Sequence, residues 1–257
     1  MPPRNKDAKP EYSLPVSIRI LTPRWQYVPA CPGYGAMNKN IQIKICGLTE
    51  VDKAFACVEL GAQAIGLVFF PKSPRFVDDR LAREISTAVS PQAKTVGVFV
   101  DETHTTVMRK IETCRLSAVQ LHGRESSAMV ERLSGDNILV IKALFEKREP
   151  SFEDAVKYGA GAFLLECGRG KMPGGNAQVW NWETARKIGG GRPIILAGGL
   201  EPQNVATAVK SAHPDAVDVS SGVEAAPGVK DLRKIRRFVT AVKKSSLDID
   251  YQPKKIF

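Results

Sequence analysis

The stretch from residue 194 to residue 224 reads IILAGGLEPQNVATAVKSAHPDAVDVSSGVE. It contains two short apolar runs, Ile194–Ala197 and Ala216–Val219, and a segment with helical spacing between them, Pro202–Lys210. Glycine or serine follows each apolar run directly. A strand, a helix and a second strand in this order predict two parallel strands with a helix packed over them.

The same unit recurs through the chain from residue 41 onward. The predicted strands are Ile41–Ile45, Ala64–Phe69, Thr95–Val100, Ala118–Leu121, Leu139–Leu144, Ala162–Leu165, Ile194–Ala197 and Ala216–Val219. The predicted helices are Glu50–Leu60, Asp78–Thr87, Thr105–Cys114, Ser126–Leu133, Phe152–Tyr158, Glu183–Ile188, Pro202–Lys210 and Asp231–Lys244. Thr49 before the first helix and Pro202 in a first helical turn are expected start signals.

Eight such repeats in about 200 residues predict a single closed (β/α)8 TIM barrel. The alternative is a doubly wound open sheet, which would usually carry a GxGxxG turn after its first strand. The chain has Cys46-Gly47-Leu48-Thr49 at that place. The barrel is therefore the preferred fold, of the α/β class with parallel strands.

The sequence divides into three segments that differ in composition and in hydrophobic pattern. Residues 37–245 form the predicted barrel domain, and residues 246–257 form a C-terminal tail. Residues 1–36 hold seven of the 17 prolines and show no apolar period, which indicates an irregular extension. It is flexible, or an artefact of start-codon choice because Met37 precedes the first strand, or a targeting peptide. We expect a chain beginning at Met37 to keep full activity.

Composition excludes several classes of protein. Hydrophobic residues make up 43% of the chain, but no apolar run approaches the ~20 residues of a membrane span. The net charge of +10 lies partly at the two ends, without a basic module interleaved with aromatic residues, so a nucleic-acid partner is not expected. Five widely spaced cysteines and three histidines predict free thiols in a cytoplasmic protein and no metal site.

The active site of such a barrel lies at the carboxyl ends of its strands. By period-two alternation Lys44 shares a face with Cys46, and Asp218 shares one with Ser220. If these faces point into the barrel, Lys44 and Lys142 enter the lumen together with Glu166 and Asp218, where opposite charges must pair. The alternative for Lys142 is an outward position between the helices.

Two glycine-containing loops predict a phosphate site. Gly198 and Gly199 follow the seventh strand, and Ser221 and Gly222 follow the eighth. Glycine lets the backbone approach a ligand closely, and loops at these two positions frequently bind phosphate with the help of a short extra helix. The segment Val223–Ala226 is the expected start of that helix.

Six segments together resemble the phosphoribosylanthranilate isomerase family. They are Lys44-Ile45-Cys46-Gly47, Phe70-Pro71-Lys72-Ser73-Pro74-Arg75, Val96-Gly97-Val98-Phe99-Val100, Val119-Gln120-Leu121-His122-Gly123, Ala197-Gly198-Gly199-Leu200 and Asp218-Val219-Ser220-Ser221-Gly222-Val223-Glu224. The resemblance covers about residues 41–242. It implies an isomerase of tryptophan biosynthesis that converts N-(5-phosphoribosyl)anthranilate to the 1-deoxyribulose 5-phosphate derivative by an Amadori rearrangement, without metal or cofactor.

The resemblance also implies roles for particular residues. Cys46 would be the general base and Glu166 the general acid, at a position where the family has aspartate. Gly174-Gly175-Asn176-Ala177 and Trp180-Asn181-Trp182, in the loop that follows, also depart from the family pattern. The remaining implied roles are carboxylate binding by Arg75, lining of the ring site by Gln120 and His122, orientation or neutralisation of Lys44 by Asp218, and phosphate binding by Gly198, Gly199, Ser221 and Gly222.

Two other functions remain open at this point. A related phosphoribosyl isomerase, such as that of histidine biosynthesis, would use a pair of aspartates, but the first strand carries Cys46. A non-catalytic binder of a phosphorylated ligand would retain phosphate affinity without isomerisation. The only partner expected is a small phosphorylated substrate, and the oligomeric state is open, with a homodimer among the options.

Overall fold

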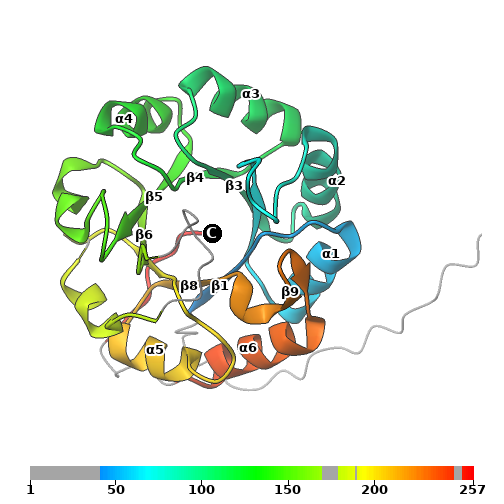
Figure 1. Ribbon diagram of the computed structural model, residues 1–257, viewed down its shortest axis with the longest axis vertical. Helices are drawn as coiled ribbons and strands as arrows, with labels where there is room; N and C mark the ends of the chain where they lie inside the picture. The colour runs from blue at the N-terminus through cyan, green and yellow to red at the C-terminus, as the bar shows by residue number, and fades with distance from the viewer. Residues whose placement is uncertain (1–40, 170–178, 189, 246–250) are drawn as a thin grey trace, which may run out of the picture. The chain divides into compact units, whose positions relative to one another are not determined.

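The computed structural model describes residues 41–169, 179–188, 190–245 and 251–257. Eight parallel strands form a closed barrel, and β8 pairs with β1 to complete the ring (Figure 1). The strands are β1 (Gln42–Cys46), β2 (Ala64–Val68), β3 (Lys94–Phe99), β4 (Ala118–Leu121), β5 (Leu139–Phe145), β6 (Ala162–Glu166), β7 (Ile194–Leu196) and β8 (Ala216–Val219). The predicted TIM barrel is confirmed.

Helical segments cover the outside of the barrel (Figure 1). The α-helices are α1 (Val51–Leu60), α2 (Asp79–Val89), α3 (His104–Cys114), α4 (Ser127–Gly135), α5 (Val205–Ala212) and α6 (Leu232–Lys244). The fifth and sixth connections carry short 3₁₀ helices instead, η1 (Phe152–Lys157) and η2 (Trp182–Lys187). Side chains cap the N-termini of three of these helices by accepting a backbone N–H group. They are Asp78 for α2, Thr103 for α3 and Ser126 for α4.

Two expected helix starts are wrong. The first helix has Glu50 as its N-cap, and the Thr49 hydroxyl donates instead to the carbonyl of Gly228 at 3.0 Å. Helix α5 begins at Val205, because Asn204 closes a turn by accepting from the N–H of Glu201 at 2.9 Å. Pro202 therefore lies in the turn before the helix. A contact between two loops displaces the first start signal, and a side-chain contact within one turn displaces the second.

Alternating residues of each strand divide between two cores. The outward residues pack under the helices, with Ile43, Ile45 and Leu144 fully buried there. The inward residues form a narrow lumen lined mostly by small side chains, which include Ala64, Val96, Ala118, Ile141, Ala143, Ala162 and Ala216. The strand register thus sends every second residue toward the barrel axis.

The expected lumen position of Lys142 is wrong, and the outward alternative holds. Its neighbours Ile141 and Ala143 occupy the lumen, so Lys142 faces the helices. The buried ammonium donates to Glu125 at 2.8 Å and to the carbonyl of Gly123 at 2.8 Å. Burial lowers the pKa of Lys142, although Glu125 acts in the opposite direction. This buried pair fixes the loop that follows β4.

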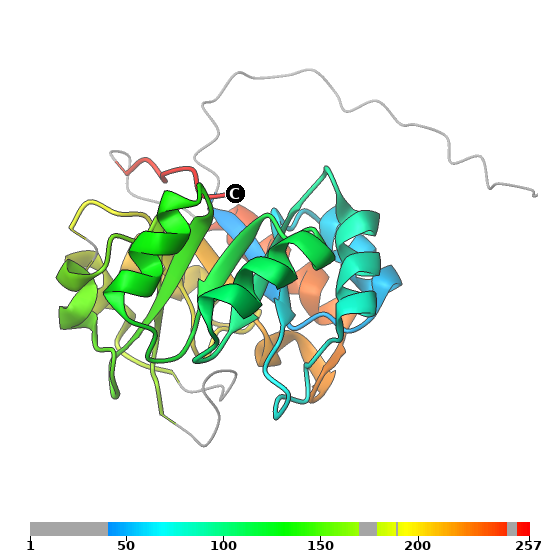
Figure 2. The ribbon, with the colours of Figure 1, turned by 90° about the horizontal axis from the view of Figure 1, so that it is seen from above.

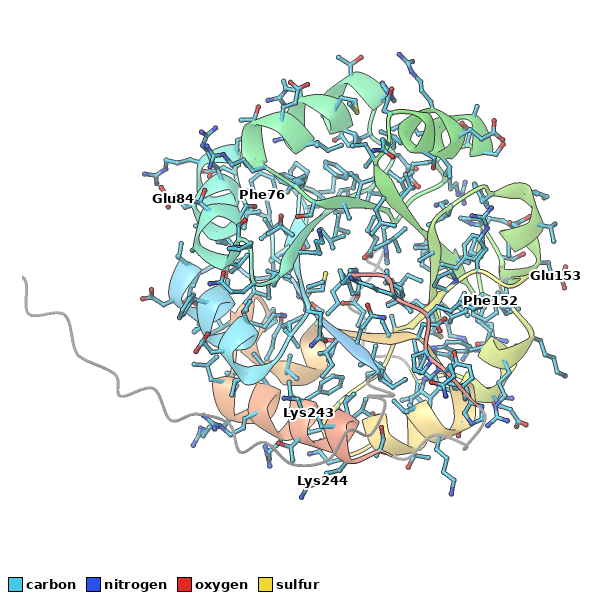
Figure 3. The ribbon with its side chains drawn as sticks, turned by 180° about the vertical axis from the view of Figure 1, so that it is seen from behind. Phe76, Glu84, Phe152, Glu153, Lys243 and Lys244 are labelled. Carbon is cyan, nitrogen blue, oxygen red and sulfur yellow. The ribbon has the colours of Figure 1, made fainter. Side chains whose placement is uncertain are left out.

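The segment 251–257 covers the amino-terminal mouth of the barrel. Phe257 is buried against lumen residues, and the Gln42 side chain accepts from the backbone N–H groups of Ile256 and Phe257 at 2.9 Å. Asp215 accepts from the Tyr251 hydroxyl at 3.0 Å. Figure 2 shows this segment on the face opposite the loops after β2 and β8, and Figure 3 shows it crossing the centre of the barrel.

A small hairpin follows β8 on the other face. It comprises a 3₁₀ turn, η3 (Ser221–Val223), and the antiparallel strands β9 (Glu224–Ala226) and β10 (Val229–Lys230). The expected helix over Val223–Ala226 is wrong, because these residues enter a strand after one turn of 3₁₀ helix. No α-helix in the described part of the chain has the length and apolar character to cross a membrane.

Candidate active site

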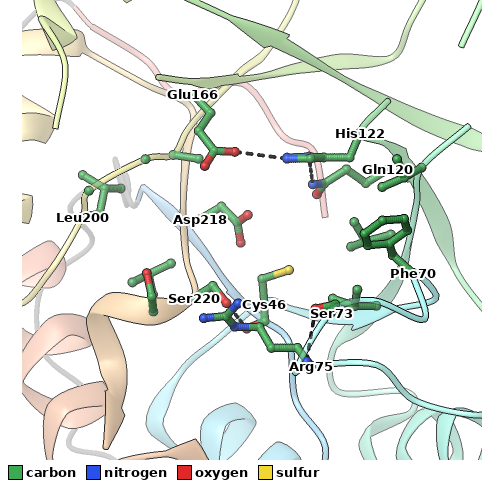
Figure 4. Close-up of a pocket in the computed structure, with 18 residues that line it drawn as sticks. Cys46, Phe70, Ser73, Arg75, Gln120, His122, Glu166, Leu200, Asp218 and Ser220 are labelled. Atoms are coloured by element: carbon green, nitrogen blue, oxygen red, sulfur yellow. Dashed lines mark hydrogen bonds and ion pairs between the residues drawn. The ribbon is translucent and has the colours of Figure 1, made fainter. Parts of the chain in front are cut away.

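A cavity that opens to solvent lies at the carboxyl ends of the strands. Side chains from β1, β4, β6 and β8 and from the loop after β2 point toward it (Figure 4). Its lining includes Cys46, Ser73, Arg75, Gln120, His122, Glu166, Gly198, Gly199, Asp218, Ser220 and Ser221. Valines and Phe70 supply an apolar wall, so the cavity can take an aromatic ring together with charged groups.

The thiol of Cys46 lies at the end of β1, above a buried ion pair. The Lys44 ammonium donates to the Asp218 carboxylate at 2.9 Å, which is the neutralisation that the family resemblance implied. Burial raises the pKa of the Cys46 thiol, while the positive charges of Lys44 and Lys230 act to lower it. Burial also disfavours the charge on Lys44, but attraction to Asp218 leaves the pKa of Lys44 above its ordinary value.

Gly66 provides the space in which the Cys46 side chain lies. The two residues are partners in the register of β1 and β2. A Cβ atom at position 66 would lie 2.6 Å from Cys46 Sγ and 2.9 Å from its Cα, and no real Cβ makes contacts this short. Any larger residue at this position would therefore displace the thiol. The sequence contained no signal for this requirement, because it depends on the pairing of two strands.

Glu166 at the end of β6 is held by a chain of hydrogen bonds. Its Oε2 lies 3.1 Å from Nε2 of His122, and Nδ1 of His122 lies 2.9 Å from Nε2 of Gln120 (Figure 4). With the amide donating to Nδ1, the neutral imidazole carries its hydrogen on Nε2 and donates it to Glu166. Oε1 of Gln120 is buried and has no partner among the described residues.

Arg75 lines the cavity and belongs to a second buried ionic group, whose other two members lie behind the cavity wall. Its Nε and Nη2 donate to the two carboxylate oxygens of Glu224, both at 2.8 Å. Lys230 of β10 donates to Oε1 of Glu224 at 2.6 Å. Burial acts to raise the pKa of Glu224, but the two cations hold it below its ordinary value. Neither Glu224 nor Lys230 had been assigned a role, although Glu224 ends the recognised motif of the eighth strand.

The loops after β7 and β8 touch each other at glycine positions. Gly198 and Gly199 have φ angles of +82° and +68°, which are strained for residues with side chains. A Cβ atom on Gly222 would lie 1.9 Å from the carbonyl oxygen of Leu200, so only glycine permits this approach. Gly198, Gly199 and Ser221 line the cavity, whereas Gly222 lies just outside its lining.

The structure thus brings nine of the ten predicted site residues to one cavity. The segment 174–177, which departs from the family pattern, lies outside the described residues, but the structure describes Trp180. Its Nε1 donates to the carbonyl of Ala197 at 2.8 Å, which ties the loop after β6 to β7. Among the described residues, no group of three histidine, cysteine, aspartate or glutamate side chains is arranged to hold a metal ion.

A parallel (β/α)8 barrel with a thiol, a carboxyl group and an arginine around a cavity at its catalytic end defines an enzyme of the TIM-barrel class. The sequence model of N-(5'-phosphoribosyl)anthranilate isomerase matches residues 43–241. The isomerase of that name from Desulfatibacillum aliphaticivorans is 53% identical over 218 residues, which is 85% of this chain and 99% of the relative.

Solved structures agree with this match. The phosphoribosyl anthranilate isomerase from Thermotoga maritima is 38% identical, with a TM-score of 0.72 over 79% of this chain and 98% of that one. A second structure, in complex with reduced 1-(o-carboxyphenylamino)-1-deoxyribulose 5-phosphate, is 37% identical, with a TM-score of 0.69 over the same shares. The chain belongs to the N-(5'-phosphoribosyl)anthranilate isomerase family. The predicted isomerase of tryptophan biosynthesis is confirmed, and the two alternative functions find no support.

Proposed function

We propose that this chain isomerises N-(5-phosphoribosyl)anthranilate with Glu166 as general acid and Cys46 as general base. The observation that carries the proposal is that both groups line one cavity, between an arginine and two glycine loops. In the first step, the protonated carboxyl of Glu166 gives its proton to the ribose ring oxygen. The bond from that oxygen to C1 breaks, and the nitrogen lone pair forms a protonated Schiff base.

In the second step, the Cys46 thiolate removes the proton from C2, and the electron pair of that bond forms the C1=C2 double bond of an enolamine. Loss of the C2 hydroxyl proton and gain of a proton at C1 then give the ketone. Burial works against the thiolate, and Lys44 and Lys230 offset it. The positive charge of the Schiff base adds to theirs at the moment at which the thiolate is needed.

The remaining side chains bind the substrate in this proposal. Arg75 takes the anthranilate carboxylate with the N–H groups that Glu224 leaves unused, since a guanidinium carries five. Gly198, Gly199 and Ser221 bind the phosphate, with Gly222 closing the loops behind them. The buried Oε1 of Gln120 accepts a hydrogen bond from a substrate hydroxyl or from the anilino nitrogen, which satisfies an otherwise costly buried acceptor.

The decisive experiment compares the wild-type protein with Cys46→Ser. The wild type restores growth without tryptophan to an auxotroph that lacks this isomerase, and it isomerises the substrate in vitro. Cys46→Ser lowers turnover by roughly 10²–10⁴-fold, because a serine hydroxyl is a far weaker acid than a thiol. Substrate binding and thermal unfolding stay near wild type. Turnover by Cys46→Ser at the wild-type rate would remove the proposed base.

The thiol itself gives a second measurement. A raised pKa predicts that alkylation of Cys46 by iodoacetamide still accelerates as the pH passes about 9, because only the thiolate reacts. A bound substrate analogue protects Cys46 from alkylation. In Cys46→Ser, the part of the alkylation that the analogue blocks is absent. Alkylation that is independent of pH, or is not slowed by the analogue, would place the reactive thiol elsewhere.

We also propose that residues 37–245 form the catalytic domain, that the enzyme works in the cytoplasm, and that it forms a homodimer without a nucleic-acid partner. Four described cysteines are free, which supports a reducing compartment. The isomerase of Thermotoga maritima is described as dimeric. Sedimentation at several concentrations tests the dimer, and a chain that starts at Met37 tests the domain boundary.

A further inference from the structure

The buried ionic group of Arg75, Glu224 and Lys230 contains two cations and one carboxylate. Arg75 faces the cavity, but its guanidinium is already bound side-on by Glu224 through Nε and Nη2. Glu224 lies behind Arg75, and the cavity lining does not include it. The side chains of both residues are about nine-tenths buried or more. This geometry occupies one edge of the guanidinium and leaves Nη1 and the second hydrogen of Nη2 for another acceptor.

Lys230 completes the group. Its ammonium is almost fully buried and donates to Glu224, to the carbonyl of Ser220 at 3.0 Å and to the Ser220 hydroxyl at 3.3 Å. Two cations therefore flank one carboxylate, and their formal charges sum to +1. Burial lowers the pKa of Lys230, and the contact with Glu224 acts in the opposite direction. A second carboxylate on the unused edge of Arg75 would bring the charge to zero. Unbalanced buried charge is costly, so the group is matched to one incoming anion.

We propose that Glu224 and Lys230 are positioning residues that make Arg75 selective for a substrate with a carboxylate on its aromatic ring. Glu224 fixes the plane and direction of the guanidinium, and Lys230 keeps Glu224 charged and in place. The inference rests on the proposed function, since it deepens the role given there to Arg75. The hairpin that carries Lys230 lies close to the loops after β1 and β2. Thr49 donates to the carbonyl of Gly228, and a Cβ atom on Gly228 would lie 2.5 Å from the carbonyl oxygen of Pro74.

Removal of the Glu224 charge tests whether Glu224 acts by orienting the Arg75 guanidinium or only through its own negative charge. If Glu224 acted only through its charge, Glu224→Gln would leave the site more positive, and a carboxylated ligand would bind more tightly. If Glu224 orients Arg75, the same substitution weakens that ligand, because the guanidinium loses its two-point anchor. The two explanations therefore predict opposite signs for one measurement.

The experiment measures the affinity of two probes by calorimetry. One is reduced 1-(o-carboxyphenylamino)-1-deoxyribulose 5-phosphate, and the other is the same compound without the ring carboxylate. We expect the wild type to prefer the carboxylated probe by about tenfold to a hundredfold, as charge-assisted hydrogen bonds allow. In Glu224→Gln most of this preference is lost, while the affinity for the second probe stays within about twofold.

Three further variants complete the test. Arg75→Met loses the same preference, and adding Glu224→Gln to it changes nothing more. Glu224→Asp keeps the negative charge on a shorter side chain and gives an intermediate preference. If Glu224→Gln fails to fold, this variant decides whether Glu224 orients Arg75. Glu131→Gln, on the exposed face of α4, is the matched control and behaves as wild type.

Specific outcomes would overturn the inference. They are an unchanged or increased preference in Glu224→Gln or Glu224→Asp, and a wild type that binds both probes equally. In these cases the isomerase assignment still stands, because turnover of the natural substrate is measured separately. A wild type that neither binds the probes nor isomerises the substrate would instead contradict the proposed function, and the inference with it.

Discussion

The two mouths of the barrel are built from the same eight strands but differ in the number of charged side chains that they bury. At the carboxyl ends lie the ion pair of Lys44 and Asp218, the hydrogen-bonded pair of His122 and Glu166, and the group around Arg75. At the amino ends lie alanines and Phe257, together with Gln42 and the buried Asp215, which hydrogen-bond to the C-terminal segment. Buried charges are costly and apolar contacts are stabilising. The comparison teaches that this chain concentrates its paired buried charges at the catalytic mouth and closes the other mouth with Phe257 and backbone hydrogen bonds from the C-terminal segment.

The largest effect on turnover is expected from substitution of Glu166 at the catalytic mouth. Glu166→Gln retains the shape and the contact with His122 but cannot supply a proton, so turnover falls by roughly 10²–10⁴-fold. Glu166→Asp keeps the acid but withdraws it from His122 by one methylene, and a shift of ~1 Å costs on the order of a hundredfold. Steady-state kinetics with a folded-state check by circular dichroism measures both.

The outcome that breaks this prediction is equal activity of Glu166→Asp and the wild type. It would mean that the hydrogen bond from His122 does not set the position of the acid. His122→Asn serves as the companion variant, since it removes the imidazole contact and keeps the carboxyl group. We expect its turnover to fall toward that of Glu166→Asp, with a smaller change in KM.

A smaller effect is expected at Gly66, where the catalytic mouth depends on a residue without a side chain. In Gly66→Ala the new methyl group overlaps the Cys46 side chain and its backbone, so the thiol must move. Turnover falls by about 10–100-fold, and the free energy of unfolding falls by about 1–3 kcal/mol. Gly135→Ala is the matched control, because a Cβ there meets nothing within 4 Å. A Gly66→Ala protein with full turnover would show that the thiol position is not fixed by β2.

The smallest effect on activity is expected at the opposite mouth. Phe257→Ala removes apolar contacts with the lumen and lowers the free energy of unfolding by about 1.5–3 kcal/mol. Its kcat and KM remain at wild-type values, because the loops of the active site lie on the other face (Figure 2). Urea unfolding and steady-state kinetics on the same preparation test both statements. A loss of kcat without a loss of stability would show that the two mouths are coupled.

The sequence alone predicted the order of the eight strands and the closed barrel, and its resemblance to a known family named the nine site residues that share one cavity. The physical reason is that period-two alternation and strand ends are local properties, and the barrel fold places all carboxyl ends on one face. The same local rules placed Lys44 and Asp218 on inward faces, and the family resemblance implied that Asp218 neutralises Lys44. They did not decide whether Lys142 points inward.

Only the tertiary structure decided the contacts between loops. Lys142 turned outward because Glu125 and two carbonyl groups meet its ammonium there. Glu224 reaches Arg75 from the segment Val223–Ala226, which the sequence had suggested as a helix start, and Lys230 reaches Glu224 from the other strand of the hairpin. Phe257 reaches the lumen from a tail that shows no period of its own. Each of these depends on which distant groups can satisfy a buried charge or cover an apolar surface, and local patterns contain no information about such partners.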